Sequence, residues 1–266
     1  MRRGAAAMTE DAFATLARYY DRIMAHVDYD RWYLASLALG EMLPAPFRHA
    51  DLACGTGTLV KRLHRAQWDT VGLDLSPAML RMGRKSGHPW RSIVGDLRAL
   101  PFRETFGLIT CLFDSINFLL SESDMAAAIQ QCGNALRPGG LFYFDYVTEE
   151  MVLRHFADQN WTENNGAFST RWENMYDRSS RITETTIRIN GGVANIILER
   201  IHSQAAITSA LAKAGLHPLA FLDAETWKPP GQKTIRVDVV AVRGKPGPYV
   251  KAFRKTQAVI QALLQS

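Results

Sequence analysis

Cysteine is scarce in this sequence, and the few cysteines form no pattern. Cys54, Cys111 and Cys132 are odd in number and include no C-x-x-C pair, which argues against a disulfide framework and against a thiolate metal or redox centre. The histidines show no metal-ligand spacing either. We therefore expect three reduced, packed thiols in a cytoplasmic protein without a metal site.

Long apolar segments and blocks of like charge are also missing. No run reaches the roughly 18 apolar residues of a membrane span, and the N-terminal MRRGAAAM lacks the apolar stretch of a signal peptide. The net charge of +5 comes from 31 basic and 26 acidic residues, and their interspersed distribution favours a solvated surface over a nucleic-acid-binding face. We expect a soluble protein. Met8 opens a better-formed helix than Met1, so residues 1–7 are expected to be a disordered extension, and the sequence leaves open whether translation starts at Met1 or at Met8.

The stretch from His49 to Arg62, HADLACGTGTLVKR, has the pattern of a buried strand, a glycine turn and a helix start. Gly55 and Gly57 lack a Cβ, so a ligand can lie against the backbone there, next to the free N–H groups of the helix. Asp74 ends the following apolar run, where a carboxylate can accept hydrogen bonds from two ribose hydroxyls. These features predict a loop for a nucleotide-type cofactor, although a glycine pair after a strand also occurs for structural reasons alone.

The type of cofactor depends on two departures from the dinucleotide fingerprint. Val60 stands where a third glycine is required, and the acid Asp51 precedes the glycines. The acid-x-x-x-Gly-x-Gly pattern of Asp51, Gly55 and Gly57 resembles the first motif of the class I S-adenosylmethionine-dependent methyltransferases, as does LRPGG followed by the apolar LFYFDYV. The resemblance covers about residues 9–243, and it includes sugar N-methyltransferases and glycine or sarcosine N-methyltransferases.

The resemblance implies an α/β fold with a doubly wound, seven-stranded Rossmann-like sheet of strand order 3-2-1-4-5-7-6. The apolar runs TVGLD, SIVGD, FGLITCLF, LFYFDYV, LAFLDA and RVDVVAVRG fit six of these strands. The run FGLITCLF, the fourth strand along the chain, is apolar enough to be buried on both faces. Between the fifth and sixth strands, the mixed runs TRWENMYD, RITETTIRI and NIILERIHSQ predict an inserted antiparallel β lid. Helices are expected from Thr9 to Met24 and from Ser121 to the glycines that follow Pro138.

Four regions follow from this pattern. We expect an N-terminal helical lid at residues 1–46 and an S-adenosylmethionine-binding Rossmann-like domain at residues 47–150 and 206–245. An inserted, acceptor-binding antiparallel sheet should occupy residues 151–205. Residues 246–266 should form a C-terminal helix that docks on its own domain or on a second subunit.

The resemblance also implies roles for individual residues. Asp51 would favour the methionyl ammonium, the backbone at Ala53 and Gly55 would line the carboxypropyl arm, and Asp74 would bind the ribose. Asp96 and the N–H of Leu97 would hold the adenine, although an Asp after a strand is commonly a turn former. The predicted cofactor-binding set is Asp51, Ala53, Cys54, Gly55, Thr56, Gly57, Asp74, Leu75, Met79, Asp96, Leu97 and Phe113.

Two residues are candidates for catalysis. A sulfonium methyl is already activated, so alignment with the acceptor is the main requirement, and a base is needed only for a protonated acceptor. His202 is the candidate base because its ordinary pKa of about 6.5 suits proton transfer near neutrality, and it is expected on a strand of the insert with Arg200. Tyr20 precedes Asp21 in a pair that, in relatives, lies near the transferred methyl. Each of the two candidates could instead be a packing residue.

The sequence thus predicts in-line methyl transfer from S-adenosyl-L-methionine to a nitrogen or oxygen of a small-molecule acceptor, with S-adenosyl-L-homocysteine as product. An RNA or protein methyltransferase is the alternative, although residues 113–118, FDSINF, lack the Asn-Pro-Pro-aromatic motif of enzymes that act on nucleobase amino groups. A non-catalytic S-adenosylmethionine-binding protein is a third possibility. We expect a monomer or homodimer without nucleic-acid or membrane partners, and the sequence leaves the acceptor open.

Overall fold

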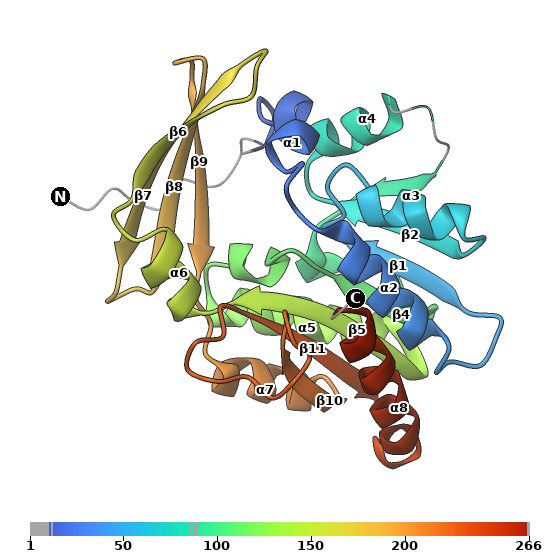
Figure 1. Ribbon diagram of the computed structural model, residues 1–266. Coiled ribbons are helices and arrows are strands. Elements are labelled where there is room, and N and C mark those ends of the chain that lie inside the picture. The colour runs from blue at the N-terminus through green and yellow to red at the C-terminus, as the bar shows by residue number, and fades with distance from the viewer. Residues whose placement is uncertain (1–10, 12, 86, 88–89, 265–266) are drawn as a thin grey trace.

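The structure is a computed structural model, and it describes residues 11, 13–85, 87 and 90–264. Figure 1 shows a core α/β unit and a second, smaller sheet that stands over one end of it. The core sheet has seven strands in the order β10-β11-β5-β4-β1-β2-β3. Counted along the chain, this is the predicted order 3-2-1-4-5-7-6, which is therefore confirmed.

Five parallel strands form most of the core sheet, and an antiparallel pair completes it. The parallel strands are β1 (Arg48–Leu52), β2 (Asp69–Asp74), β3 (Arg91–Val94), β4 (Phe106–Cys111) and β5 (Leu136–Val147). The antiparallel strands are β10 (Leu216–Asp223) and β11 (Arg236–Arg243). All residues of β4 are buried, as expected for a strand that is covered on both faces.

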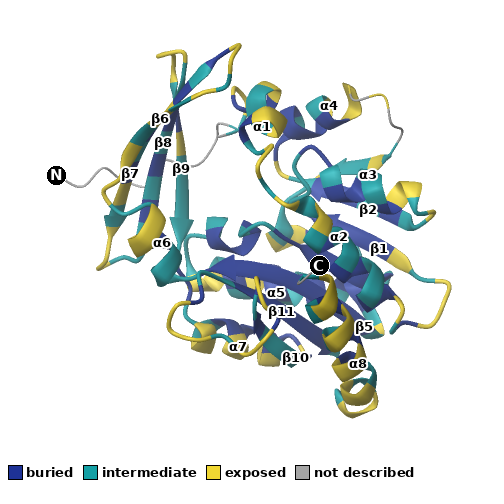
Figure 2. Ribbon diagram, viewed as in Figure 1, coloured by how far each residue is buried: buried dark blue, intermediate teal, exposed yellow. Residues whose placement is uncertain are grey.

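Helices cover both faces of this sheet. The helices α2 (Tyr29–Gly40), α3 (Thr58–Arg65) and α8 (Gly247–Leu263) contribute apolar side chains to the cluster on one face. The helices α5 (Glu122–Ala135) and α7 (Gln204–Lys213) do so on the other face. Helix α4 (Pro77–Lys85) follows β2, and the short 3-10 helices η1 (Leu97–Ala99) and η2 (Ser115–Phe118) follow β3 and β4. Figure 2 shows the core strands as the most buried part of the molecule.

The insert begins with α6 (Glu149–His155) and continues as an antiparallel sheet of four strands. These are β6 (Asn160–Asn164), β7 (Ser169–Asp177), β8 (Ile182–Ile189) and β9 (Ala194–Arg200), in that order. The sequence predicted the last three strands and missed β6. Burial alternates along β8, so one face of this sheet is covered and the other faces solvent.

Helix α1 (Ala17–Ile23) joins the insert to the core unit (Figure 1). Leu16 and Ile23 pack with Phe168, Trp172 and Ile187 of the insert, which cover the inner face of the smaller sheet. On its other side, Ala17 packs against Ala78 and Met79 of α4. One short helix therefore contacts both the inserted sheet and the helix that follows β2.

Three sequence-based boundaries need correction. Helix α1 starts at Ala17 after turns, and the part of the predicted helix at residues 9, 10 and 12 lies outside the described residues, as do Met1 and Met8. Helix α5 ends at Ala135, because Pro138 disfavours helical geometry at Arg137 and Leu136 already pairs with Phe106 in the core sheet. Strand β9 ends at Arg200, so His202 lies beyond the insert strand that was predicted to carry it.

Candidate active site

The glycine loop after β1 has the left-handed backbone that its glycines allow. Gly55 has φ of 57° and Gly57 has φ of 77°, and Gly57 is the residue from which α3 starts. Ala53 also has a positive φ, 53°, although it has a side chain. The N–H of Cys54 donates to the carbonyl of Leu73 at 3.0 Å, which fixes the loop to the end of β2.

Trp90 contributes to the requirement for glycine at three separate places. A Cβ on Gly57 would lie 2.7 Å from the Trp90 ring, and one on Gly72 would lie 2.6 Å from it. A Cβ on Gly83 would lie 2.8 Å from the same ring and only 2.2 Å from the carbonyl oxygen of Thr56. The indole thus fills a space that only glycines leave, below the turn that carries the predicted cofactor residues. Sequence reasoning missed Trp90, since nothing near it in the chain marks it as part of the loop.

Asp74 is held rigidly at the end of β2. The N–H of Gly55 donates to its Oδ2 at 2.7 Å, and the N–H of Ser76 donates to its Oδ1 at 2.8 Å. Each carboxylate oxygen has a further lone pair for a ligand hydroxyl. Leu75, the next residue, is 60% exposed. Val94, the partner of Asp74 on strand β3, is 55% exposed. A carboxylate next to two exposed apolar side chains suits a ribose and an adjoining flat ring.

Asp51 is buried next to the loop. Its Oδ1 accepts a hydrogen bond from the hydroxyl of Thr110 at 2.6 Å. That hydroxyl must therefore accept from Nε2–H of His49, 3.0 Å away, which leaves Nδ1 of His49 to accept from Thr70. Burial lowers the pKa of His49 to about 3 and raises the pKa of Asp51 to about 7, although the hydrogen bond from Thr110 opposes the second shift. The carboxyl of Asp51 is thus poised to ionise beside a cation.

Asp96 already has a partner on its own turn. It accepts from the N–H of Arg98 at 2.8 Å as the cap of η1, and Arg98 also forms an ion pair with it at 2.7 Å. The hydrogen bonds from Arg98 lower the pKa of Asp96. Binding of an adenine amino group by Asp96 and of N1 by Leu97 stays a prediction, and it would require Asp96 to share its carboxylate with Arg98.

The N-terminal segment is fastened across the loop by polar contacts. The hydroxyl of Thr56 donates to Asp21 at 2.5 Å, and the hydroxyl of Ser76 donates to Asp11 at 2.6 Å. Met79 is buried under α1, and its methyl group would lie 3.3 Å from a Cβ on Gly55. The segment that contains α1 therefore lies over the predicted cofactor loop, as the lid hypothesis requires.

Tyr20 and Tyr29 lie between this loop and the end of β4. The two hydroxyls lie close enough for each to affect the pKa of the other. Burial raises the pKa of Tyr20 well above its usual range, and the nearby Tyr29, Asp114 and Asp74 raise it further. Both phenols are therefore neutral near pH 7, and Tyr20 is close to a carboxylate of the loop and to one beyond β4. Its predicted role near the transferred methyl stays open.

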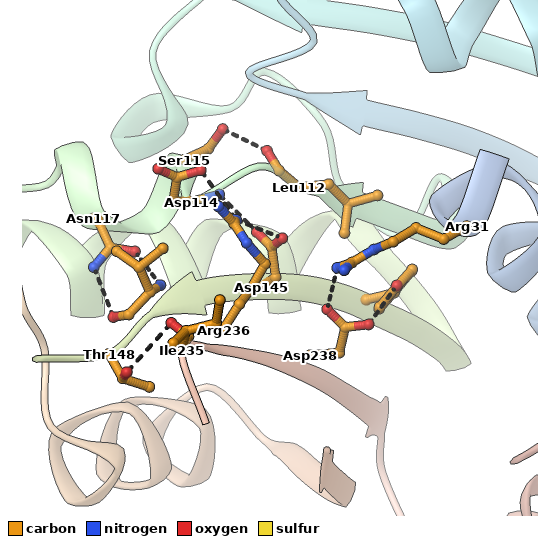
Figure 3. A network of polar contacts seen from close by, with 12 residues as sticks. Arg31, Leu112, Asp114, Ser115, Asn117, Asp145, Thr148, Ile235, Arg236 and Asp238 are labelled. Atoms are coloured by element: carbon orange, nitrogen blue, oxygen red, sulfur yellow. Dashed lines mark hydrogen bonds and ion pairs between the residues drawn. The ribbon is translucent and has the colours of Figure 1, made fainter. Parts of the chain in front are cut away.

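Charged side chains form a network of hydrogen bonds and ion pairs at the end of β4 (Figure 3). Phe113 and Asp114 have successive positive φ values of 60° and 52°, a strained geometry that concentrates at functional sites. The N–H of Asp114 donates to Asp145 on β5 at 2.7 Å. The guanidinium of Arg236 on β11 donates to Asp114 at 3.0 Å and to Asp145 at 2.9 Å.

The insert contributes Glu199 to this network. Glu199 lies close enough to Asp114 for that charge to act on it, and its Oε1 is fully buried without a hydrogen-bond partner. Burial raises the pKa of Glu199 well above its usual range, and the charge of Asp114 adds to this. No sequence pattern pointed to Glu199, because its contact with Asp114 joins two segments that are far apart in the chain.

His202 lies at the base of the insert. Its Nε2 donates to the carbonyl of Leu119 at 2.8 Å, and its buried Nδ1 has no partner. Burial lowers its pKa, and the charged groups that act on it, Arg200, Glu122 and Arg181, belong to none of the cofactor loops. His202 lines a cavity with residues that include Thr148 and Arg181. Its predicted role as base stays a hypothesis that these contacts do not support.

Two absences concern the described residues alone. In residues 11, 13–85, 87 and 90–264, no three or more His, Cys, Asp or Glu side chains are grouped so that they could hold a metal ion. Within the same part of the chain, no helix has both the length and the apolar character to cross a membrane.

Comparisons with known proteins agree with the predicted cofactor class. Residues 50–140 match the family described as "Methyltransferase domain". The putative methyltransferase YqeM of Bacillus subtilis is 27% identical over 194 residues, which cover 71% of this chain and 77% of that protein. A dTDP-3-amino-3,4,6-trideoxy-α-D-glucopyranose N,N-dimethyltransferase of Streptomyces venezuelae is 33% identical over 91 residues, 34% of this chain and 38% of its own.

A solved structure extends the likeness to the whole fold. An S-adenosylmethionine-dependent methyltransferase of Clostridium acetobutylicum superposes with a TM-score of 0.75 at 25% sequence identity. The match covers 88% of this chain and 100% of that one. Together, the matched domain, the strand order and the shared fold show that this chain is an S-adenosylmethionine-dependent methyltransferase with the class I methyltransferase fold.

Proposed function

We propose that this methyltransferase transfers the methyl group to a nitrogen or oxygen of a small-molecule acceptor. The observation that carries the proposal is the contact between the insert and the ends of the core strands. Asn117 Nδ2, beyond β4, donates to the carbonyl of Arg200 at 2.9 Å, and Glu199 meets Asp114. A site covered in this way favours a small ligand over a polymer, which needs an open groove.

The residues of the loop fit the cofactor of this class. S-adenosylmethionine supplies an activated sulfonium methyl, and its ammonium would neutralise the buried carboxylate of Asp51. Its ribose would bind Asp74, and its adenine would lie near Leu75. The protein then has to hold the acceptor in line with the methyl and to exclude water, for which Tyr20 and Tyr29 are well placed.

The proposal also covers the size of the acceptor, the location and oligomeric state of the protein, and the remaining residues of the cofactor loop. The Streptomyces relative is named for N,N-dimethylation of an amino sugar nucleotide, which supports a small acceptor although the match covers a minority of each chain. A cytoplasmic location and a monomeric or dimeric state are retained from the sequence. The remaining predicted loop residues, Cys54 and Thr56 among them, are proposed to contact the cofactor through their backbone.

The test combines binding with turnover. Calorimetry should show binding of S-adenosylmethionine and S-adenosylhomocysteine and none of NAD. Release of S-adenosylhomocysteine should then be measured with a small-molecule panel, with total RNA and with unfolded protein as alternative acceptors. Turnover on RNA or protein alone would refute the small-molecule proposal. Binding without turnover on any acceptor would point to a non-catalytic protein.

A further inference from the structure

The charges at the end of β4 do not balance. Three carboxyl groups, Asp114, Asp145 and Glu199, meet one guanidinium, that of Arg236. The nearby Arg31 is paired with Asp238 instead, at 3.4 Å. A proton on Glu199, whose pKa burial raises, still leaves one negative charge in excess. Asp145 is buried, and Asp114 and Glu199 are only partly exposed, so an excess charge here is costly and the cluster favours an additional cation.

The orientation of Glu199 shows where such a cation would bind. Glu199 pairs with Thr183 across the strands of the insert, and Thr183 is on the covered face of that sheet. Glu199 therefore points toward the core unit, where it meets Asp114. Its Oε1 has no solvent access and no hydrogen-bond partner, so an acceptor lone pair is left unused within the cluster.

The neighbouring groups narrow the chemistry of the ligand. Asp114 is also one of the charges that act on Tyr20 and Tyr29, whose hydroxyls lie on the side of the cofactor loop. A ligand group that lies between the Asp114–Glu199 pair and the two tyrosine hydroxyls must therefore carry positive charge and donate hydrogen bonds to carboxylates. A primary or secondary ammonium has both properties, whereas a hydroxyl group has no charge to offset the excess.

We propose that Glu199 and Asp114 form the acceptor subsite, and that the acceptor is a small molecule with a primary or secondary amine. This inference rests on the proposed function and deepens it. When the ammonium binds, Glu199 releases to solvent the proton that it carries in the free protein, and the ionised carboxylate then accepts a proton from the ammonium, which frees the nitrogen lone pair. The nitrogen then forms a bond to the methyl carbon while the carbon–sulfur bond breaks, and its electron pair stays on sulfur as the thioether of S-adenosylhomocysteine.

The experiment uses Glu199→Gln, which keeps the shape of the side chain, and Glu184→Gln as the matched control. Glu184 is on the adjacent strand β8, and its partner Leu198 precedes Glu199, so it lies on the opposite face of the same sheet. The probes are amino sugars and alkylamines, each paired with its alcohol counterpart. Amine binding to the protein saturated with S-adenosylhomocysteine is measured by calorimetry, and turnover is measured separately.

We expect wild-type protein to methylate amines and not the paired alcohols. Glu199→Gln should weaken amine binding at least tenfold and lower turnover by about 10² or more, with S-adenosylhomocysteine affinity changed less than twofold. Glu199→Asp, which keeps the charge, should retain more turnover than the Gln variant. Glu184→Gln should behave as wild type in every assay.

Other results would overturn the inference in distinguishable ways. Methylation of alcohols or thiols without amines would refute the amine subsite and leave the proposed function standing. Wild-type amine binding and turnover in Glu199→Gln would show that the carboxyl pair only fastens the insert to the core. Failure of the whole small-molecule panel, with cofactor binding intact, would refute the proposed function as well as the inference.

Discussion

The buried carboxyl of Asp51 makes cofactor affinity depend on pH. Its pKa is raised by burial to about 7 in the protein, whereas the ammonium of S-adenosylhomocysteine binds the ionised form. Cofactor binding must therefore release the proton that Asp51 carries at lower pH. Replacing Asp51 by Asn removes both the charge and the titration, and keeps an oxygen that can accept from Thr110.

The size of the effect follows from the pKa. With a value of about 7, roughly one tenth of the molecules are ionised near pH 6 and nine tenths near pH 8. Wild-type affinity for S-adenosylhomocysteine should rise about tenfold across this interval and then level off. Asp51→Asn should bind more weakly by about 1.5 to 3 kcal/mol near pH 8, which is typical of a hydrogen bond to a charged group, and should show no such rise.

The stability of the cofactor-free protein should fall as the pH rises, whereas the affinity for the cofactor should increase. A carboxyl whose folded pKa is above its unfolded value favours unfolding above the unfolded value, and this cost grows until the pH passes the folded pKa. A shift of the Asp51 pKa from 3.8 to about 7 lowers the free energy of unfolding by at most roughly 4 kcal/mol. Asp51→Asn should therefore stabilise the cofactor-free protein near pH 8, and the gain should shrink as the pH falls toward about 4.

Calorimetric titrations at several pH values, in buffers of different ionisation enthalpy, measure both the affinity and the number of protons released. About half a proton should leave at pH 7 in the wild type, and none in Asp51→Asn. The control is Asp69→Asn, because Asp69 begins β2 at the end opposite Asp74 and is paired with surface arginines. The same pH slope in wild type and in Asp51→Asn would refute the assignment.

Three further predictions test other parts of the site. Asp74→Ala should weaken S-adenosylhomocysteine binding by about 1.5 to 3 kcal/mol in calorimetry, while Asp69→Asn should not; equal affinities would contradict the ribose role. Amides of residues 13–24 should gain protection from hydrogen exchange when S-adenosylhomocysteine is added, and unchanged exchange would argue against a lid. His202→Asn should lower the free energy of unfolding by about 1 to 3 kcal/mol, because Leu119 loses its donor, with turnover kept. A turnover loss of about 10² to 10⁴ with unchanged stability would instead support His202 as the base.

The sequence by itself determined the parts of the protein that depend on local patterns. The strand, glycine turn and helix around Gly55 could be predicted, because steric freedom at glycine and hydrophobic periodicity act within a few residues. The strand order followed from the resemblance to a family, and the structure confirms it. Asp51 and Asp74 could be assigned to the same edge of the sheet, because parallel strands bring their carboxyl ends together.

Only the tertiary structure decided which distant residues meet at that edge. Trp90 requires glycine at positions that no local pattern connects, and Glu199 reaches Asp114 from the inserted sheet. The pKa of Asp51 was equally hidden, since it depends on burial by the surrounding fold. Such contacts arise when separate elements pack, and packing depends on the shape of the whole core rather than on the neighbours of a residue in the chain.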